Sequence, residues 1–486
     1  MAEVIAPARS STRLIVIVLA LGTATFAMGQ SVVSPILSTL QRDLHTSQGM
    51  VTWVLTAYLL SAAVATPILG RVGDMVGKDR VLVIVMLVFG VGSVIAALAP
   101  NIQIMIVARA VQGVGGAVLP LSFGIIRDEV PQPKIAGAIS ITSAVLGAGG
   151  GLSTVLAGPV VSGLSYHWLF WFPVIVIATS AIMARKFIPP SPVRIHARIN
   201  WLSAVLLASW LVAFLLGVSQ APKWGWLSVK VVGLIAIALV LAAGWIANER
   251  RAATPVVDLK MMRIPIVWRV NLIALLYGVG AFGQFAFLPE FVQTPRASGY
   301  GLGASVTMAG LIILPSAILT FVFSGLSSTI SRWIGVKGAV VLGSTLLIPC
   351  FAVLMVPGQH ESLAFLSAAF MGAGYGLGFA TISNMVSIAV PPEQTGIANG
   401  MIGNVRTIGG AVGAAIASSL ITANVGASGY PMVGGYNAAW LMLTLACAAS
   451  ALVSLAIPSV TRPIRPKLVD RGTDGPACIT AGQLST

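Results

Sequence analysis

Gly70-Arg71-Val72-Gly73-Asp74-Met75-Val76-Gly77-Lys78-Asp79-Arg80 is a short basic stretch between two long apolar runs. These runs, 51–69 and 81–99, each have about the 20 residues that a helix needs to cross a bilayer. So short a connection makes the two helices antiparallel neighbours, and its glycines permit a tight turn. Its Lys and Arg residues predict that the turn faces the cytoplasm. Asp74 is expected to pair with a basic side chain or a helix N-terminus.

The composition is that of an all-α integral membrane protein. Of the 486 residues, 57% are hydrophobic and only 8% are charged, whereas soluble domains have about 25% charged residues. A water-soluble fold has no interior large enough for this much apolar surface. The net charge of +15 comes from cations in the connections, so it reports membrane topology and does not indicate a nucleic-acid partner.

Cysteine and histidine give no sign of a metal site or a disulfide framework. Cys350 and Cys447 lie in apolar runs, Cys478 lies near the C-terminus, and the four histidines lie in connections. Three scattered cysteines are too few for a framework and lack the spacing of metal ligands. We therefore expect no metal and no cofactor.

Fourteen apolar runs have the length of a membrane span. They cover approximately 14–37, 50–69, 81–99, 102–125, 137–163, 168–188, 201–219, 229–248, 267–292, 303–326, 337–357, 362–389, 397–422 and 437–457.

Positive charge fixes the orientation of these runs. If both termini are cytoplasmic, nearly all Lys and Arg residues fall in cytoplasmic segments, as the positive-inside rule requires. The exceptions outside the spans are Arg42, Lys223, Lys230 and Arg296. One missed span would destroy this bias, so the distribution supports an even number of spans with both termini in the cytoplasm.

Two basic connections, near 189–200 and 252–264, divide the chain. We expect a six-helix half at 1–188, two central helices with their flanking loops at 189–264, and a second six-helix half at 265–458. The polar segment 459–486 is predicted to be a disordered cytoplasmic tail.

The stretch 70–80 resembles the signature loop between helices 2 and 3 of the major facilitator superfamily, G-x-L-x-D-R-x-G-R-R. The matching residues are Gly70, Asp74, Gly77, Lys78 and Arg80. Met75 stands where a basic residue is usual, and Asp79 is an additional acid. The resemblance implies two six-helix halves with the substrate between them. With two extra central helices, the chain resembles the 14-spanner drug:proton antiporters of the multidrug efflux family.

Arg127 and Asp128 follow the fourth span. The family resemblance implies that such residues form a charge lattice with the loop that holds Asp74, and that this lattice stabilises the outward-facing state.

Arg109 lies inside the fourth span, and Gln112 follows one helical turn later. A guanidinium within a bilayer is costly unless it faces a cavity or finds acceptors. The pattern R-x-x-Q-G-x-G at 109–115 resembles the fourth-helix motif of proton-coupled facilitators, where the arginine is implicated in coupling. The alternative is an arginine that ties its helix to neighbouring carbonyl groups.

The fifth span is rich in glycine and ends in Gly158-Pro159-Val160-Val161-Ser162-Gly163. This ending resembles the antiporter motif of exporter families, G-P-x-x-G-G, with Ser162 in place of the first glycine of the final pair. Gly158, Pro159 and Gly163 are the matching residues and imply export. The alternative is close helix packing with no directional meaning.

The first span departs from the family pattern L-D-x-T-I-V-N-V-A-L-P. Gly29 stands at the aspartate position and Ser34 at the asparagine position. In the family, this aspartate is one of the usual proton-linked groups. Its absence leaves open which residue of this chain would couple transport to protons. Glu290, near the outer end of its span, and the intramembrane Arg406 are the further candidates. The alternative for Glu290 is a solvated acid at the outer rim of the membrane. The alternative for Arg406 is a residue that packs between helices or caps backbone carbonyl groups.

A substrate pocket is expected near the membrane midplane, between the halves. Aromatic rings with a few amides suit a lipophilic ligand, including a cationic one. The candidates are Gln30, Ser34, Trp53, Tyr58, Tyr277, Phe282, Gln284, Phe285, Tyr375 and Asn384.

Three functions fit these features. The first is export of a small lipophilic drug or metabolite by alternating access, in exchange for protons. The second is a facilitator, or a lipid or metabolite exporter, that is not proton-coupled. The third is a polytopic membrane enzyme, but no span core holds the histidine or acid that such an enzyme needs. No G-x-x-x-x-G-K-[ST] nucleotide loop occurs, which excludes a primary pump of that type. We expect no enzyme activity and no nucleotide.

Overall fold

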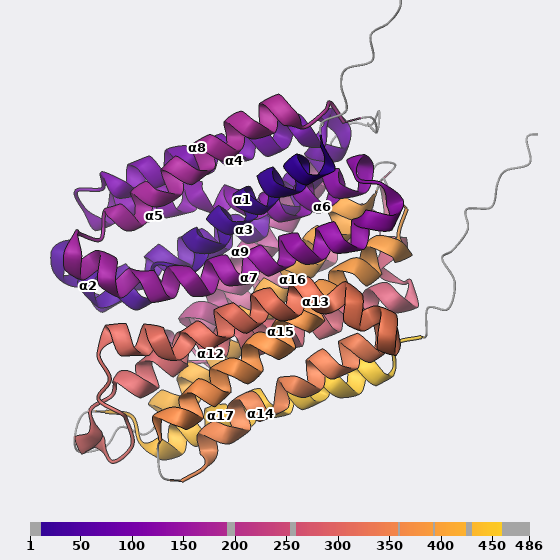
Figure 1. Cartoon of the computed structure of the whole chain (residues 1–486). Helices are drawn as coiled ribbons and strands as arrows, with labels where there is room; N and C mark the ends of the chain where they lie inside the picture. Colours follow the sequence, from indigo (N-terminus) through magenta and orange to yellow (C-terminus); the bar gives the residue numbers. More distant parts are fainter. Residues whose placement is uncertain are drawn as a thin grey trace, which may run out of the picture.

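The computed structural model describes residues 11–191, 200–252, 259–357, 360–391, 394–423 and 430–458. These residues form one bundle of long helices that lie roughly along a common direction (Figure 1). The predicted C-terminal tail, 459–486, lies outside the described residues, as does most of the predicted loop 189–200.

The first group of helices is followed by a pair, α9 and α10. The first group comprises α1 (Thr12–Ser31), η1 (Ser34–Ile36), α2 (Leu37–Asp43), α3 (Gln48–Val76), α4 (Lys78–Ala97), α5 (Ile102–Gly113), η2 (Val114–Ala117), α6 (Val118–Glu129), α7 (Gln132–Gly163) and α8 (Trp168–Phe187). The pair comprises α9 (Trp201–Trp224) and α10 (Val229–Arg251).

The second group completes the bundle. It comprises α11 (Leu259–Met262), α12 (Pro265–Gln293), η3 (Arg296–Ser298), α13 (Val306–Leu346), α14 (Ile348–Ala352), η4 (Val353–Met355), α15 (Glu361–Ala389), α16 (Thr395–Thr422) and α17 (Val433–Leu455).

Thirteen helical segments among the described residues are long and apolar enough to cross a membrane. The chain is therefore an all-helical, multi-pass membrane protein. The sequence predicted fourteen runs, and the difference lies in one segment. Thr307–Met355 is counted as a single span of 49 residues, but it contains two predicted runs, 303–326 and 337–357. Gly335, between them, has a non-helical φ of 77°.

The first part of α13, before Gly335, runs parallel to α15. Ser316 of α13 lies against Gly372 of α15, and one helical turn later Thr320 lies against Gly376. Residue numbers therefore rise in the same direction along both helices.

The second part of α13 runs antiparallel to α15. Gly343 lies against Gly378, whereas Leu347, which is further along the chain, lies against the earlier residue Gly374. The chain therefore reverses direction at Gly335, where the positive φ suits a residue without a side chain.

The same kind of turn joins α3 to α4. Gly77, with φ 124°, separates Val76 at the end of α3 from Lys78 at the start of α4. The predicted tight turn is therefore present. This turn, the start of α1 and the end of α6 with Arg127 lie at one end of the bundle, which we call the basic end.

The first and second groups meet along α7 and α13, which lie side by side through the middle of the bundle (Figure 1). Small residues make this contact close. Gly147 faces Thr320, Gly151 faces Ala317, and the position of a Cβ at either glycine lies too close to α13 for a side chain. Glycine at such positions lets two membrane helices approach closely.

The α9–α10 pair packs beside both groups. α9 contacts α3 of the first group and α16 of the second. Trp226, in the turn between α9 and α10, donates a hydrogen bond of 2.7 Å from its indole nitrogen to Ser419 of α16. The pair therefore covers one side of the junction between the groups.

Candidate functional site

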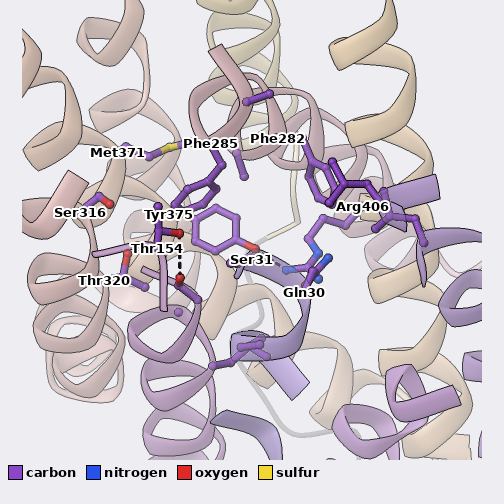
Figure 2. A pocket seen from close by; sticks show the side chains of 18 of the residues that line it. Gln30, Ser31, Thr154, Phe282, Phe285, Ser316, Thr320, Met371, Tyr375 and Arg406 are labelled. Atoms are coloured by element: carbon purple, nitrogen blue, oxygen red, sulfur yellow. Dashed lines mark hydrogen bonds between the residues drawn. The ribbon is translucent and has the colours of Figure 1, made fainter. Parts of the chain in front are cut away.

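The main cavity lies between the two groups of helices and has an empty volume of about 1120 Å³, which includes its open part. α1, α3, α5 and α7 contribute to it from the first group, and α12, α13, α15 and α16 from the second. Its walls are formed by Ala27, Gln30, Ser31, Leu55, Tyr58, Leu59, Arg109, Leu146, Gly147, Gly150, Thr154, Ala281, Phe282, Phe285, Ala286, Ser316, Thr320, Met371, Tyr375 and Arg406. Figure 2 shows this cavity from close by.

Arg109 is one of two charged residues among the described residues of these walls, and it is fully buried. Its Nε donates to the carbonyl oxygen of Val54 at 3.2 Å, and its Nη1 donates to Oε1 of Gln112 at 2.7 Å. The guanidinium carbon lies 4.1 Å from the centroid of the Tyr58 ring. A neutral amide, a carbonyl group and an aromatic face thus surround this cation.

A short hydrogen-bond chain holds Arg109 in place. Gln112 accepts from Arg109 and donates from Nε2 to Ser93 on α4 at 2.7 Å. Gln112 itself does not line the cavity. It therefore acts on the cavity by positioning the guanidinium.

Arg406 of α16 is the second charged residue on the walls, and its side chain is 8% exposed. Its Nη1 donates a hydrogen bond to the hydroxyl of Tyr375, and its guanidinium carbon lies 5.2 Å from the centroid of the Phe379 ring. Tyr375 and Phe379 stack with their rings 5.5 Å apart. Figure 2 shows the Tyr375 hydroxyl and the Arg406 guanidinium pointing toward each other in the cavity.

The rest of the wall combines apolar side chains with small hydroxyl groups. Phe282, Phe285 and Met371 supply apolar surface, while Thr154 and Thr320 belong to the small polar residues. No Asp or Glu occurs among the described residues that line this cavity. The cavity therefore offers an aromatic surface, hydroxyl groups and two guanidinium groups, one from each group of helices.

A buried ion cluster lies at the basic end, away from the cavity. Nζ of Lys78 lies 2.8 Å from Asp128 at the end of α6 and 3.5 Å from Asp74 at the end of α3. Both side chains of the Lys78–Asp74 pair are 1% exposed. Asp79 accepts a hydrogen bond of 3.0 Å from the backbone nitrogen of Ser191. The cluster joins α3, α4, α6 and the segment that follows α8.

Polar contacts also join the two groups of helices near the basic end. The hydroxyls of Ser140 on α7 and Ser327 on α13 lie 2.8 Å apart. Asn384 of α15 donates to Ser140 at 3.2 Å and to the carbonyl oxygen of Ala136 at 3.4 Å. These contacts hold α7 against the second group on the basic side of the cavity.

Seven residues singled out from the sequence lie together on the cavity. Five were substrate candidates and two were coupling candidates: Gln30, Tyr58, Phe282, Phe285 and Tyr375, and Arg109 and Arg406. The side chain of Ser34, another substrate candidate, lies outside the described part of the structure.

Four other substrate candidates lie off the cavity. Tyr277 is buried behind Tyr375 and hydrogen-bonds Ser344 at 3.0 Å. Gln284 is buried and accepts a hydrogen bond from the Cys350 thiol at 2.8 Å. Asn384 lies at the contact near the basic end, and Trp53 does not reach the cavity walls. Tyr277, Gln284 and Asn384 lie on faces of their helices that pack against other helices.

Glu290, the acid considered for coupling, also lies off the cavity. It sits three residues before the end of α12, and its side chain is exposed. The proline beside it, Pro289, lies within α12. No described contact brings Glu290 close to Arg109 or Arg406.

The residues of the expected antiporter motif lie at the end of α7 that is distant from the basic end. Gly158 lies against Thr307 of α13 at ordinary contact distance, and α7 continues through Pro159 to Gly163. Gly163 has open space at the position of a Cβ. The motif thus includes one glycine at the junction of the two groups.

Sequence reasoning missed the small polar and small apolar residues of the wall. Ser31, Thr154, Ser316 and Thr320 add small hydroxyl-bearing side chains to the walls, and Gly150 adds a position without a side chain. A helical spacing of three or four residues from Ala27 to Ser31 on α1 and from Ser316 to Thr320 on α13 is the signal that marks these faces.

Comparison with known proteins agrees with this architecture. Residues 19–414 match the family model described as Major Facilitator Superfamily. The chain is 26% identical over 420 residues to Multidrug resistance protein 3 of Bacillus subtilis (strain 168), covering 85% of this chain and 80% of that protein. It is 26% identical over 416 residues to the Tetracenomycin C resistance and export protein of Streptomyces glaucescens, covering 84% and 75%.

The fold is similar to that of solved transporter structures. The crystal structure of the human organic anion transporter MFSD10 (TETRAN) superposes with a TM-score of 0.66 at 17% identity, covering 92% of this chain and 100% of that one. A point mutant of the nucleoside transporter NupG gives 0.56 at 15% identity, covering 91% and 99%. The family match spans most of the chain and agrees with the helical bundle and its cavity. The chain therefore belongs to the Major Facilitator Superfamily, a family of secondary transporters and not of enzymes.

Proposed function

We propose that this chain exports lipophilic small molecules across the cytoplasmic membrane by alternating access. The observation that carries the proposal is the cavity between the two groups of helices, because each group supplies four helices to its walls. A site shared in this way is opened to either side when one group rocks against the other. The distant relatives named as resistance and export proteins support the outward direction.

The proposal assigns the two moving units to residues 1–188 and 265–458. The α9–α10 segment, 189–264, is then an addition beside their junction. The ion cluster of Asp74, Lys78 and Asp128 joins helices within the first unit, while Ser140 and Ser327 meet across the junction. If the Ser140–Ser327 contact breaks while the ion cluster stays intact, the cavity opens toward the basic end.

We further propose fourteen membrane crossings, with both termini cytoplasmic. At about 1.5 Å per residue, the 49-residue segment Thr307–Met355 is more than twice as long as the hydrocarbon core, which is about 30 Å thick. The reversal at Gly335 supports two crossings within it. With that division, the basic end is the cytoplasmic end under the positive-inside rule.

Proton exchange is the coupling proposed from the family resemblance, with Arg109, Gln112, Glu290 and Arg406 as the candidate residues. One observation favours a second candidate function, a transporter that moves its substrate without protons. The described walls of the cavity contain no Asp or Glu, and a bound proton normally needs such a group. Both candidates use the same cavity and the same conformational change.

Efflux of a lipophilic dye from energised vesicles tests the function and its coupling together. Wild type, Arg109→Ala and Glu290→Gln are compared with and without an uncoupler that collapses the proton gradient. Efflux that the uncoupler abolishes while the membrane potential is held constant, and that Arg109→Ala loses, supports exchange for protons. Loss in Glu290→Gln as well identifies the acid that carries the proton.

Other outcomes separate the alternatives. Efflux that survives the uncoupler supports the transporter without protons. If the wild-type protein, correctly folded in the vesicles, moves none of a panel of anionic, neutral and cationic lipophilic dyes, the export proposal is wrong.

A further inference from the structure

The cavity carries two positive charges and no negative charge among the described residues of its walls. Arg109 comes from α5 and Arg406 from α16, so each group of helices contributes one guanidinium. The described acidic residues at the ends of the surrounding helices do not pair with these arginines. Asp74 and Asp128 pair with Lys78 at the basic end, and Glu290 has an exposed side chain off the cavity.

Arg109 has only neutral partners among the described residues. A carbonyl group, an amide and an aromatic ring contact it, and its Nη2 has no hydrogen-bond partner there although the residue is fully buried. Arginine presents five donors in a planar fork that matches the two oxygens of a carboxylate. An oxyanion that reaches this guanidinium from the cavity would therefore find a donor that no described group of the protein uses.

Arg406 has the same character. Its described contacts are the hydroxyl of Tyr375 and the ring of Phe379, both neutral. Its Nε is buried without a hydrogen-bond partner in the described part of the chain. Two buried guanidinium groups without a carboxylate partner are costly, and an anion that enters the cavity relieves this cost by pairing with them.

From this charge we propose that the cavity binds an amphipathic organic anion: an aromatic or aliphatic body that carries a carboxylate, sulfonate or similar acid group. The proposal rests on the transport function above and specifies the class of its substrate. The acid group pairs with the guanidinium groups that Arg109 and Arg406 bring to the walls, and the body packs on Phe282, Phe285 and Met371. The ring faces of Tyr58 and Phe379, which would attract a cationic substrate, are already occupied by the two arginines.

Packing around Gly29 also keeps acidic side chains away from Arg109. The position of a Cβ on Gly29 lies 2.7 Å from Cζ of Phe89 and 3.7 Å from the hydroxyl of Tyr58. An acid at this position would stand beside the ring that supports Arg109, but Phe89 fills the space that its side chain needs. The packing therefore keeps an acid of the protein away from the guanidinium.

A negatively charged substrate has a consequence for transport. A membrane potential that is negative inside drives an anion outward, and for a singly charged anion the ratio of its concentrations at equilibrium changes about tenfold for every 59 mV. Exchange of a monovalent cation for one proton moves no net charge and does not respond to the potential. The direction in which the potential drives transport thus reports the sign of the charge that crosses the membrane.

The first experiment measures binding to the purified full-length protein in detergent. Fluorescein, an anion, and rhodamine 123, a cation with the same ring system, are titrated separately. We expect fluorescein to bind more tightly. Arg406→Gln should weaken its binding by about 10- to 100-fold, the range for lost charge-assisted hydrogen bonds, and Arg406→Lys by less.

A matched control removes an arginine elsewhere. Arg332 is exposed and contacts Thr329 in the described part of the chain, so Arg332→Gln should leave fluorescein binding unchanged. Tighter binding of rhodamine 123, or fluorescein binding that is insensitive to Arg406→Gln in a folded variant, overturns the proposal.

The second experiment measures dye movement in liposomes that contain the protein, under an imposed potassium diffusion potential. We expect faster movement of fluorescein toward the positive side, and no such response in Arg406→Gln. Fluorescein that binds at the cavity but is not moved in either direction contradicts the transport function and leaves the binding proposal intact. Rhodamine 123 transport that is independent of the potential supports the transport function and overturns the anionic substrate.

Discussion

The guanidinium of Arg109 lies over the ring of Tyr58, with 4.1 Å between the guanidinium carbon and the ring centroid. The hydroxyl of the same tyrosine donates to the carbonyl oxygen of Phe26 at 3.1 Å. Tyr58 therefore joins α3 to α1 and presents its ring face to a cation inside the bundle. A desolvated cation–π contact is worth about 2 kcal/mol.

Tyr58→Phe and Tyr58→Leu separate the ring from the hydroxyl. Tyr58→Phe keeps the ring and should keep most of the stability and the transport activity. Tyr58→Leu loses the ring face and should lower the free energy of unfolding by about 2 kcal/mol more than Tyr58→Phe does. Thermal unfolding of the detergent-solubilised variants measures the difference. Equal losses in both variants would show that the hydroxyl, and not the ring, supports the site.

Gln112→Glu tests the charge of the cavity with almost no change of shape. The new carboxylate would lie where the Gln112 amide oxygen now accepts from Arg109 at 2.7 Å. It would neutralise the guanidinium, so the variant should bind fluorescein about tenfold more weakly. Its binding of rhodamine 123 should stay the same or become tighter. The titrations used for Arg406→Gln measure both effects, and unchanged fluorescein affinity would count against an anion held by Arg109.

The ion cluster at the basic end gives a prediction about stability. Lys78 is shared by Asp74 and Asp128, so Lys78→Met leaves two neighbouring carboxylates without this cation. Loss of a buried partner costs about 3–5 kcal/mol. Adding Asp128→Asn to Lys78→Met should recover part of this loss, because one uncompensated charge disappears. Unfolding of the two single variants and the double variant measures the coupling, and strictly additive losses would show that the three side chains act separately.

The helical architecture was accessible from the sequence because a bilayer imposes length and polarity on each span. The predicted runs correspond to long helices from α1 to α17, and the turn at Gly77 lies where the stretch 70–80 places it. The number of membrane spans differs between sequence and structure at Gly335, because the chain reverses direction there within the single element α13. The sequence shows two apolar runs here, 303–326 and 337–357, whereas the structure has one helical segment of 49 residues.

The cavity was only partly accessible from the sequence. Arg109 and Arg406 stood out because charged residues are expensive within a membrane, and both lie on its walls. Tyr277 and Gln284 were candidates because aromatic rings and amides suit a lipophilic ligand, but they form hydrogen bonds with Ser344 and Cys350 inside the second group of helices. The direction in which a side chain leaves its helix depends on packing between helices, and hydropathy does not report it.

Alternating access itself is tested most directly by a disulfide across the contact near the basic end. The hydroxyls of Ser140 and Ser327 lie 2.8 Å apart, so cysteines at these positions are close enough to join. Cys350 and Cys447 are buried, and Cys478→Ser removes the cysteine near the C-terminus. Dye transport is measured for Ser140→Cys/Ser327→Cys in this background after oxidation and again after reduction, with Ser140→Cys alone as the control.

Oxidation is expected to stop transport in the double variant, reduction to restore it, and the control to be unaffected by either treatment. Transport at the full rate, with the disulfide verified by mass spectrometry, would contradict the claim that the two groups of helices must separate at the basic end.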